Sequence, residues 1–559
     1  MNPYLLFNTV RYLKPIQIKG QIIWRIKSRL ENPAKIAGKP VPVYPGCRWK
    51  PAGPFASPIP PGRGNKAAIK DGSFSFLNQD QKIGWPPDWG GVKLPRLWQY
   101  NLHYFEWIWA LDFEDAAAAA SSWIKNHPLR KGAVGWEPGP ISQRLQNWLA
   151  YFWGNHQRET EARPDFKDRL WRSVFMQAEW LSNHLETHIL GNHLFDNGAS
   201  LALAGSCFAG EEPQRWLETG VGILKKEIPE QILPDGMHFE RSPSYHAGII
   251  RSLLPLYNTG ENFLQQLTAE PLSRMVKALR KLCHPDGEIA LFNDSAFGIQ
   301  KSPDELTREV SRLIDIEKDS TSADGAWALP DAGYYGFRGG EASYVIFDAG
   351  PIGPDYLPGH AHGDIFSFEL SLNGQRVIVD SGVFDYEIGK MREYCRSTRA
   401  HNTVEINNKD QCEFWSAFRV GRRARIRDVE WLPFADGFEL SARHDGYQRL
   451  PGRPIHTRRA VWKAKGLLKV NDEIKSSKEL TAISRLHLHP VCEVEKSGDK
   501  TAIISFNQSR FLVTWIGEGS FKVEDSLYCP EFGVKLPNRV LSFSFSGRNP
   551  TCGFIIEKI

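Results

Sequence analysis

The sequence predicts an α+β protein in which a helical toroid or solenoid is followed by an antiparallel β-sandwich. Between about residues 96 and 320, apolar and aromatic residues recur at three- and four-residue spacing, with short joins that carry Gly, Pro and Asp. From about residue 325 the period falls to two. Because helices come first and strands later, we expect two packed parts and no alternating β–α units. The predicted divisions are 1–90 (N-terminal helix and connector), 91–325 (helical toroid) and 326–559 (antiparallel β-sandwich).

The first predicted element is a basic amphipathic helix over residues 16–30. We expect it to dock on the protein's own body, and attachment to a membrane surface is the less favoured alternative. The apolar stretches of residues 1–30 are broken by Asn8, Arg11, Lys14 and Lys19, so the N-terminus does not match a secretory signal peptide. Residues 31–75 are rich in Pro, Gly and Lys, which predicts an extended connector.

The helical part rests on several stretches with helical apolar spacing. WQYNLHYFEWIWALDFEDAAAAAS combines helix-forming Ala with aromatic residues. Further helices are predicted for ISQRLQNWLAYFWGNH, DRLWRSVFMQAEWLSNHLETHIL, ASLALAGSCF, QRWLETGVGILKKEIPEQIL, YHAGIIRSLLPLYNTG and PLSRMVKALRKLC.

The β part rests on short alternating runs, including SYVIFDAG, FSFELSLNGQRVIVDSG, RARIRDVEWL and GFELSARHDGY. Asn373-Gly374 and Asp445-Gly446 are hairpin turn signals between such runs.

Composition limits the class of protein. The chain of 559 residues is 41% hydrophobic and 24% charged, as in ordinary globular proteins. A net charge of +5 is too small to favour nucleic acid as a partner, but it is compatible with a polyanion if arginines line one groove. The 19 Trp residues should mostly be core, and such an excess also suits a ligand made of sugars.

Cysteine spacing and hydropathy bear on the compartment. The eight Cys form no Cys-x-x-Cys pair, so we expect buried free thiols in a reducing compartment. No apolar run reaches 18 residues, so no transmembrane segment is predicted. Without a clear signal peptide, the location stays open between the bacterial cytoplasm and export by an unrecognised route. The oligomeric state is not predicted.

The β part carries a cluster of chemically active residues. His360 and His362 lie in GHAHGD, and an extended backbone would point both to one side. The Asn373-Gly374 hairpin would bring Asp380 beside His362, and His401 precedes the next run. Two His and one Asp could hold a single divalent ion, Zn²⁺ or Mn²⁺. The alternative is a hydrogen-bonded His/Asp network without metal.

The helical part carries a second group. Asn192 and His193 precede a predicted helix, where Asn197 is expected to act as its cap. Tyr245 begins another helix near Arg241, whose charge could assist ionisation of the phenol. Ordinary capping and packing are the alternatives for each.

Further polar and aromatic residues are candidates for contacts with a ligand. Arginines before His401 could clamp carboxylates or sulfates, and a solvated surface is the alternative. The candidate binding residues are Asn101, Trp136, Gln143, Arg144, Arg241, Arg396 and Arg399.

A helical half with NH…RSPSYH, followed by a β half with GHAHGD…VDSG…RAHNTV, resembles the heparinase II/III-like polysaccharide lyases, including broad-specificity glycosaminoglycan lyases. The resemblance covers most of residues 90–480 and is most specific over 190–250 and 355–405. It implies an (α/α) toroid packed on an antiparallel β-sandwich, with the active site in the cleft between them. It also implies β-elimination on uronic-acid polysaccharides such as hyaluronan, chondroitin sulfate and heparan sulfate or heparin.

The resemblance assigns roles to individual residues. Asn192, with His193, matches the group that neutralises the uronate carboxylate. Tyr245 matches the catalytic phenol and His360 the catalytic imidazole, either of which could act as the base. A structural metal is expected on His362, Asp380 and His401.

Three other functions compete with the lyase. A metal-dependent hydrolase would use the His and Asp residues around an activated water. A glycoside hydrolase on a helical toroid would need two opposed carboxylates, for which Glu137, Asp196 and Glu240 are candidates. A non-catalytic or hydrolytic protein of bacterial exopolysaccharide metabolism would bind the polymer without unsaturated product.

Overall fold

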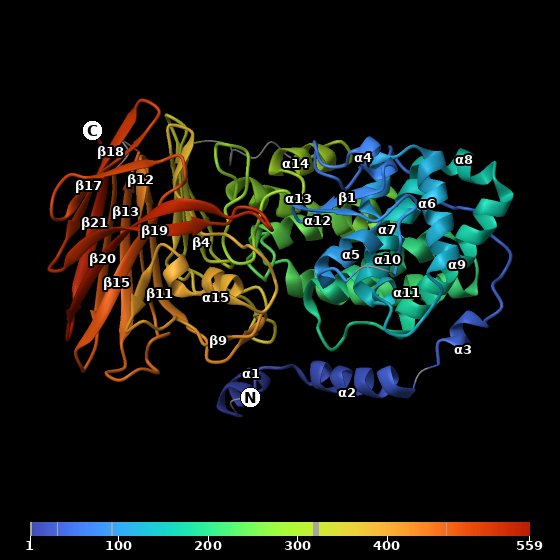
Figure 1. Cartoon of the computed structure of the whole chain (residues 1–559), viewed down its shortest axis with the longest axis horizontal. Helices are drawn as coiled ribbons and strands as arrows, with labels where there is room; N and C mark the ends of the chain where they lie inside the picture. Colours follow the sequence, from blue (N-terminus) through green and yellow to red (C-terminus); the bar gives the residue numbers. More distant parts are fainter. Residues whose placement is uncertain (1–2, 31, 91–92, 317–323, 465–466) are drawn as a thin grey trace.

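The computed structural model describes residues 3–30, 32–90, 93–316, 324–464 and 467–559. A helical part and a β part lie end to end along the long axis of the molecule (Figure 1). The last helix of the helical part ends at Ser311, and the first strand of the β part begins at Gly325. The predicted order, a helical toroid followed by an antiparallel β-sandwich, is confirmed.

The helices of the described chain are α1 (Pro3–Val10), α2 (Pro15–Leu30), α3 (Ala34–Ala37), α4 (Lys66–Lys70), α5 (Arg96–Tyr104), α6 (Phe113–Asn126), α7 (Pro138–Trp148), α8 (Gln157–Glu161), α9 (Pro164–Asn183), α10 (Gly191–Cys207), α11 (Glu211–Gln231), α12 (Pro243–Asn258), α13 (Asn262–Lys281), α14 (Pro303–Ser311) and α15 (Lys390–Arg396). Large aromatic side chains fill the toroid, as the Trp content predicted: Trp98, Trp123, Trp148, Trp153, Trp171 and Trp216 are all buried.

Helices α10 and α11 pack backbone against backbone at glycines. A Cβ atom on Gly205 would lie 2.4 Å from the amide nitrogen of Leu217, and one on Gly220 would lie 2.4 Å from that of Ala202. Any larger residue would force the two helices apart. This contact fixes α10, whose first turn carries Asn192 and His193.

The strands are β1 (Ser73–Phe76), β2 (Gln79–Lys82), β3 (Gly325–Leu329), β4 (Tyr334–Gly339), β5 (Ser343–Asp348), β6 (Phe368–Leu372), β7 (Gln375–Ile378), β8 (Val404–Ile406), β9 (Phe414–Trp415), β10 (Arg419–Val420), β11 (Ile426–Phe434), β12 (Gly437–His444), β13 (Ile455–Lys463), β14 (Leu467–Lys475), β15 (Leu480–His487), β16 (Glu493–Lys496), β17 (Thr501–Phe506), β18 (Ser509–Ile516), β19 (Ser520–Tyr528), β20 (Leu536–Gly547) and β21 (Thr551–Lys558).

Three antiparallel sheets form the β part. The largest has the order β11-β12-β13-β14-β21-β18-β17-β16, and the smaller ones are β3-β4-β5-β6-β7 and β19-β20-β15-β8. Trp515 of the large sheet stacks on Phe543 of β20 with centroids 5.2 Å apart, and Phe554 stacks on Phe368 of β6 at 6.0 Å. Both smaller sheets therefore pack face to face on the large sheet, as a sandwich requires.

Both predicted hairpins join consecutive antiparallel strands, but only the first has the predicted tight turn. Asn373 and Gly374 have φ of +51° and +78° and join β6 to β7, as a two-residue turn demands. Asp445-Gly446 instead begins a ten-residue loop between β12 and β13. There the Asp445 carboxylate accepts a hydrogen bond from the Arg425 amide, and Tyr447 is buried. Loop packing has overridden the turn signal.

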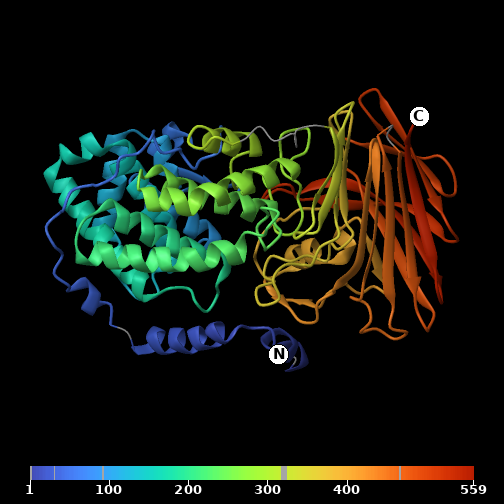
Figure 2. The same ribbon diagram turned by 180° about the vertical axis from the view of Figure 1, so that it is seen from behind.

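The predicted N-terminal helix is α2, and it docks on the body of the protein. Gln17 donates hydrogen bonds to the carbonyl oxygens of Ile189 and Tyr356, each at 3.2 Å. With α1 it forms an arm along one edge of the molecule, alongside both parts (Figures 1 and 2). Within the described residues, no helix is both long and apolar enough for a membrane crossing.

Candidate active site

A cavity of about 1000 Å³ lies where the toroid, the β part and the N-terminal arm meet. Side chains from α5, α7, α10 and α12 line it on one side, and loops of the β part line it on the other. Four predicted catalytic residues reach this one cavity: Asn192, His193, Tyr245 and His360. The tertiary structure thus joins the two clusters that lie more than a hundred residues apart in the sequence.

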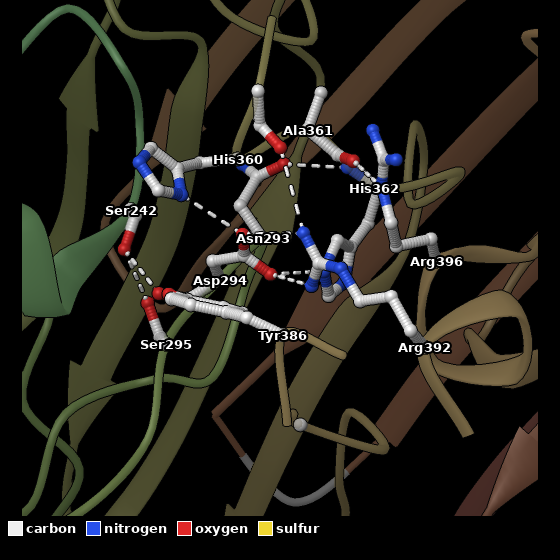
Figure 3. A network of polar contacts seen from close by, with 12 residues as sticks. Ser242, Asn293, Asp294, Ser295, His360, Ala361, His362, Tyr386, Arg392 and Arg396 are labelled. Carbon is white, nitrogen blue, oxygen red and sulfur yellow. Dashed lines mark hydrogen bonds and ion pairs between the residues drawn. The ribbon is translucent and has the colours of Figure 1, made fainter. Parts of the chain in front are cut away.

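Asp294, in the loop between α13 and α14, is the centre of the site (Figure 3). Its carboxylate pairs with His360 Nδ1 at 2.9 Å, with His362 Nε2 at 2.8 Å and with the guanidinium of Arg392. Burial favours the neutral acid, but Arg392 and the two imidazoles hold the pKa of Asp294 well below its usual range. The carboxylate is therefore ionised and accepts every one of these hydrogen bonds.

The prediction that His360 and His362 share one side of an extended strand is wrong. Residues 359–364 are irregular, and the main chain there is held by bonds such as His362 N to Asn293 Oδ1. Both rings bond to the Asp294 carboxylate, but their surroundings differ. His360 borders the cavity, whereas His362 is completely buried.

Tyr245 lies in the first turn of α12, where the Ser242 hydroxyl caps the helix. Its ring packs on His360 with centroids 3.8 Å apart, and its hydroxyl lies 3.0 Å from that of Tyr386. Burial and the charge of Asp294 raise the pKa of Tyr245 above its ordinary value. In the free protein this residue is therefore a neutral phenol.

The expected assistance of Tyr245 by Arg241 is wrong. Arg241 donates to the carbonyl oxygens of Phe239, Asp331 and Ala332. Its guanidinium therefore links the helical part to the β part. It is buried and does not line the cavity.

Asn192 and His193 occupy the first turn of α10, at the positive end of its dipole. Their approach to the β part depends on Gly191, because a Cβ there would lie 2.2 Å from Leu357 Cδ2. Asn197, expected to cap this helix, lies inside it and donates to Glu186 instead.

His193 carries a positive charge into the cavity. Its Nδ1 lies 3.0 Å from Glu186 Oε1, and its side chain is 39% exposed. Burial lowers the pKa of His193, but the charge of Glu186 outweighs it and raises the value to about 9. The ring is thus an imidazolium at neutral pH, placed beside the Asn192 amide.

Glu240 completes the border between the two parts. One carboxylate oxygen accepts a hydrogen bond from the main-chain N–H of Asn192 at 3.4 Å, and the other lies 3.5 Å from His360 Nε2. Burial raises the pKa of Glu240. It was proposed above as a hydrolase carboxylate together with Asp196 and Glu137. Asp196 lines the cavity bonded to Gln143 and Ser252, whereas Glu137 lies outside it, bonded to Arg96.

The three predicted metal-binding residues lie together, and none of them lines the cavity. Atoms of His362, Asp380 and His401 lie within 4.8 Å of one another, and all three side chains are fully buried. His401 Nδ1 is 2.7 Å from Asp380 Oδ2. Nδ1 of His362 and Nε2 of His401 have no hydrogen-bond partner among the described residues. Two unsatisfied buried imidazole nitrogens beside a carboxylate are a donor set that suits a divalent ion.

Of the seven predicted binding residues, Asn101 and Gln143 line the cavity. Arg144 does not, because its guanidinium is buried against Trp123 and donates to Gln177 and to two carbonyl oxygens. Trp136 is also core, with its indole nitrogen bonded to the His127 carbonyl. Both are parts of the toroid packing.

The arginines before His401 also miss the cavity. Arg396 is buried and donates to the carbonyl oxygens of Ala361, Ser416 and Ala417, so it holds loops together. Arg399 is exposed but packs over Tyr394 away from the cavity. Exposed cations at the cavity are instead Arg96 and Arg419.

Sequence reasoning missed Asp294 and Tyr386 and gave Arg392 no separate role. A signal was present for Asp294, because the polar run Asn293-Asp294-Ser295 directly follows the apolar Ile289-Ala290-Leu291-Phe292. No sequence pattern distinguishes Tyr386 from the other tyrosines.

Comparisons with known proteins agree with this arrangement. The family model of the heparinase II/III N-terminus matches residues 76–315, and that of the heparinase II/III-like C-terminal region matches residues 321–557.

Curated relatives match over part of their length. A heparin-sulfate lyase of Pedobacter heparinus is 29% identical over 318 residues, which are 52% of this chain and 47% of that protein. A heparin-sulfate lyase of Bacteroides stercoris is 28% identical over 346 residues, 52% of this chain and 50% of that protein. The chain thus spans about half the length of these relatives.

Solved structures share the fold over almost the whole chain. A crystal structure of heparinase III aligns with a TM-score of 0.74 at 18% identity, covering 99% of this chain and 94% of that one. Heparan sulfate lyase from Pedobacter heparinus aligns with a TM-score of 0.59 at 19% identity, covering 96% and 87%. At these identities, the likeness shows the fold.

Proposed function

We propose that this chain, which belongs to the heparinase II/III-like family, is a polysaccharide lyase that cleaves uronic-acid polysaccharides by β-elimination. The observation that carries the proposal is the shared cavity. It holds a charge-neutralising pair, Asn192 and His193, together with a proton-transfer pair, Tyr245 and His360. Elimination next to a carboxylate requires both functions.

Neutralisation comes first, because the proton on carbon 5 of a uronate is only weakly acidic while the adjacent carboxylate is negative. The Asn192 amide donates a hydrogen bond to that carboxylate, and the His193 imidazolium supplies a positive charge. The N-terminal end of α10 adds its partial charge at the same place. Together these groups stabilise the enolate-like anion that develops as the proton leaves.

His360 is the proposed base. Ionised Asp294 can only accept a hydrogen bond, so it fixes the proton of His360 on Nδ1 and leaves a lone pair on Nε2. Nε2 takes the proton from carbon 5, and the electron pair of that bond forms the double bond between carbons 4 and 5.

Tyr245 is the proposed acid. Its raised pKa keeps the proton on the phenol, which transfers it to the glycosidic oxygen as the bond from carbon 4 breaks. Before the next turnover the proton on His360 must return to Tyr245, and the two rings are already in contact. A mechanism with Tyr245 as both base and acid would need a phenolate, which the raised pKa disfavours.

We further propose one divalent ion, Zn²⁺ or Mn²⁺, held by His362, Asp380 and His401. The supporting observations are the buried cluster and its unsatisfied imidazole nitrogens. Burial lowers the pKa of His362 to about 3, so the ring is neutral, as a ligand must be. When bound, the ion would supply a fixed positive charge and a rigid support. Nε2 of His362 then orients Asp294, which orients His360.

Among anionic polysaccharides, heparan sulfate is the first candidate, because the curated relatives named above are heparin-sulfate lyases. Exposed Arg419 at the cavity supplies a charge for a sulfate or carboxylate. The test is a panel of heparan sulfate, heparin, chondroitin sulfate and hyaluronan, scored for near-ultraviolet absorbance of an unsaturated uronate.

The same panel separates the competing functions. Reducing ends without ultraviolet product would indicate a hydrolase. Binding without either product, even at high protein concentration, would indicate a non-catalytic protein.

A further inference from the structure

The outer face of the N-terminal arm, α1 with α2, combines exposed apolar side chains with a uniform positive charge. Eleven of the 22 exposed large apolar side chains of the described chain lie between Tyr4 and Leu30, and all but Trp24, which borders the cavity, lie outside the cavity lining. Residues 1–30 contain six Lys and Arg and no Asp or Glu; of these, Lys14 pairs with Glu230 and Lys27 points to the body of the protein. So strong a concentration of apolar surface in one short segment marks an interaction site.

Helix α2 docks on the protein through its polar and small residues. Gln17 is buried and bonded to two carbonyl oxygens, and Lys27 donates to the carbonyl of Asn183. At Gly20 the helix approaches so closely that a Cβ would lie 2.8 Å from the amide nitrogen of His188. This orientation is the reverse of an ordinary surface helix, which buries its apolar side.

The apolar side of α2 consequently faces outward. Ile22, Ile26 and Leu30 recur every four residues and are 55%, 52% and 80% exposed. Exposed Lys19 and Arg29 flank them on the helix surface. An isoleucine stripe bordered by cations is the pattern of helices that lie in the interface of a bilayer.

Helix α1 precedes α2 in the arm and is anchored to the β part. Phe7 is 63% exposed on it. Thr9 Oγ1 donates to the Val420 carbonyl at 3.1 Å, and Arg423 donates to the carbonyl of Asn8. The arm is thus fastened at both parts of the molecule, and both views show it along one edge (Figures 1 and 2).

We infer that the outer face of the arm docks on an anionic lipid surface. The isoleucines and Phe7 would enter the headgroup boundary, and the cations would pair with lipid phosphates. A second copy of the chain is the less suitable partner, because a symmetric contact would bring together two segments that carry Lys and Arg but no Asp or Glu of their own.

The docking would place the cavity next to the lipid surface. The inner side of the same arm lines the cavity through Gln21 and Trp24. Combined with the proposed function, this placement would direct the activity to polymer held close to a membrane, whereas the docking itself is a separate inference. The inference rests on the arm alone and does not depend on the proposed lyase activity.

The test is flotation of the full chain with vesicles of phosphatidylcholine, with or without a quarter of phosphatidylglycerol. The protein should float with the anionic vesicles, and half-molar sodium chloride should weaken binding. The double variant Ile22→Asp/Ile26→Asp should bind at least tenfold less. Leu432→Asp, which changes an equally exposed apolar residue on β11 (59%), is the matched control and should bind like wild type.

Thermal unfolding of each variant checks that these exposed positions leave the fold intact. Equal flotation of wild type and double variant, or no flotation at all, would overturn the inference. So would a wild-type dimer in sedimentation that the double variant loses, because the face would then join two copies of the chain.

Discussion

Replacing Tyr245 by Phe removes one hydroxyl from the cavity and leaves the ring that packs on His360. The hydroxyl lies 3.0 Å from that of Tyr386, and loss of this hydrogen bond should cost about 1 kcal/mol of stability. Loss of a general acid should lower kcat by roughly 10²–10⁴-fold, which corresponds to about 3–5 kcal/mol of barrier. The catalytic effect should therefore exceed the structural one severalfold.

Tyr386→Phe is the matched control, because it removes the same hydrogen bond and keeps the Tyr245 hydroxyl. We expect its kcat to stay within about tenfold of wild type. Initial rates of near-ultraviolet absorbance at saturating polysaccharide give kcat, and thermal melts report the fold.

A folded Tyr245→Phe protein with wild-type kcat would refute the assignment of Tyr245 as the acid. Equal losses in both variants would mean that the hydrogen bond between the two phenols matters, and that Tyr245 has no separate role in proton transfer.

Three further predictions concern the metal, the pH profile and the substrate. Elemental analysis should find about one divalent ion per chain, lost in His362→Ala; a well-folded wild type without metal would exclude the site. The pKa of His193, about 9, lies above its ordinary 6.5. Its stabilising charge is therefore complete below pH 6.5 and is lost as pH rises through about 9. Accordingly, kcat/KM should fall above pH 9 in wild type, and a profile shared by His193→Gln would contradict this. Arg419→Ala should raise KM several-fold, whereas Arg399→Ala, outside the cavity, should not; equal effects would remove Arg419 from substrate binding.

The fold class was predictable because it depends on local periodicity. Apolar spacing of three and four residues specified the helices, and alternation specified the strands. The turn at Asn373-Gly374 was predictable because both residues tolerate positive φ. Asp445-Gly446 misled because its neighbour Tyr447 is buried and donates to the Val404 carbonyl, a contact between distant segments.

The prediction that Arg144 and Arg396 bind a ligand was wrong for a different physical reason. A sequence motif does not reveal whether a guanidinium faces solvent or satisfies buried carbonyl oxygens. Arg144 and Arg396 both do the latter, because loops and helix ends leave main-chain acceptors that a five-donor side chain fits well.

The sequence by itself determined the two-part architecture, the types of residue available for catalysis, and the grouping of His362, Asp380 and His401. Only the tertiary structure decided what connects them. Asp294 lies 66 residues from His360 along the chain, yet it links that imidazole to His362. The tertiary structure also decided that α2 turns its apolar side outward. Periodicity defines the faces of a helix, but long-range packing chooses which face is buried.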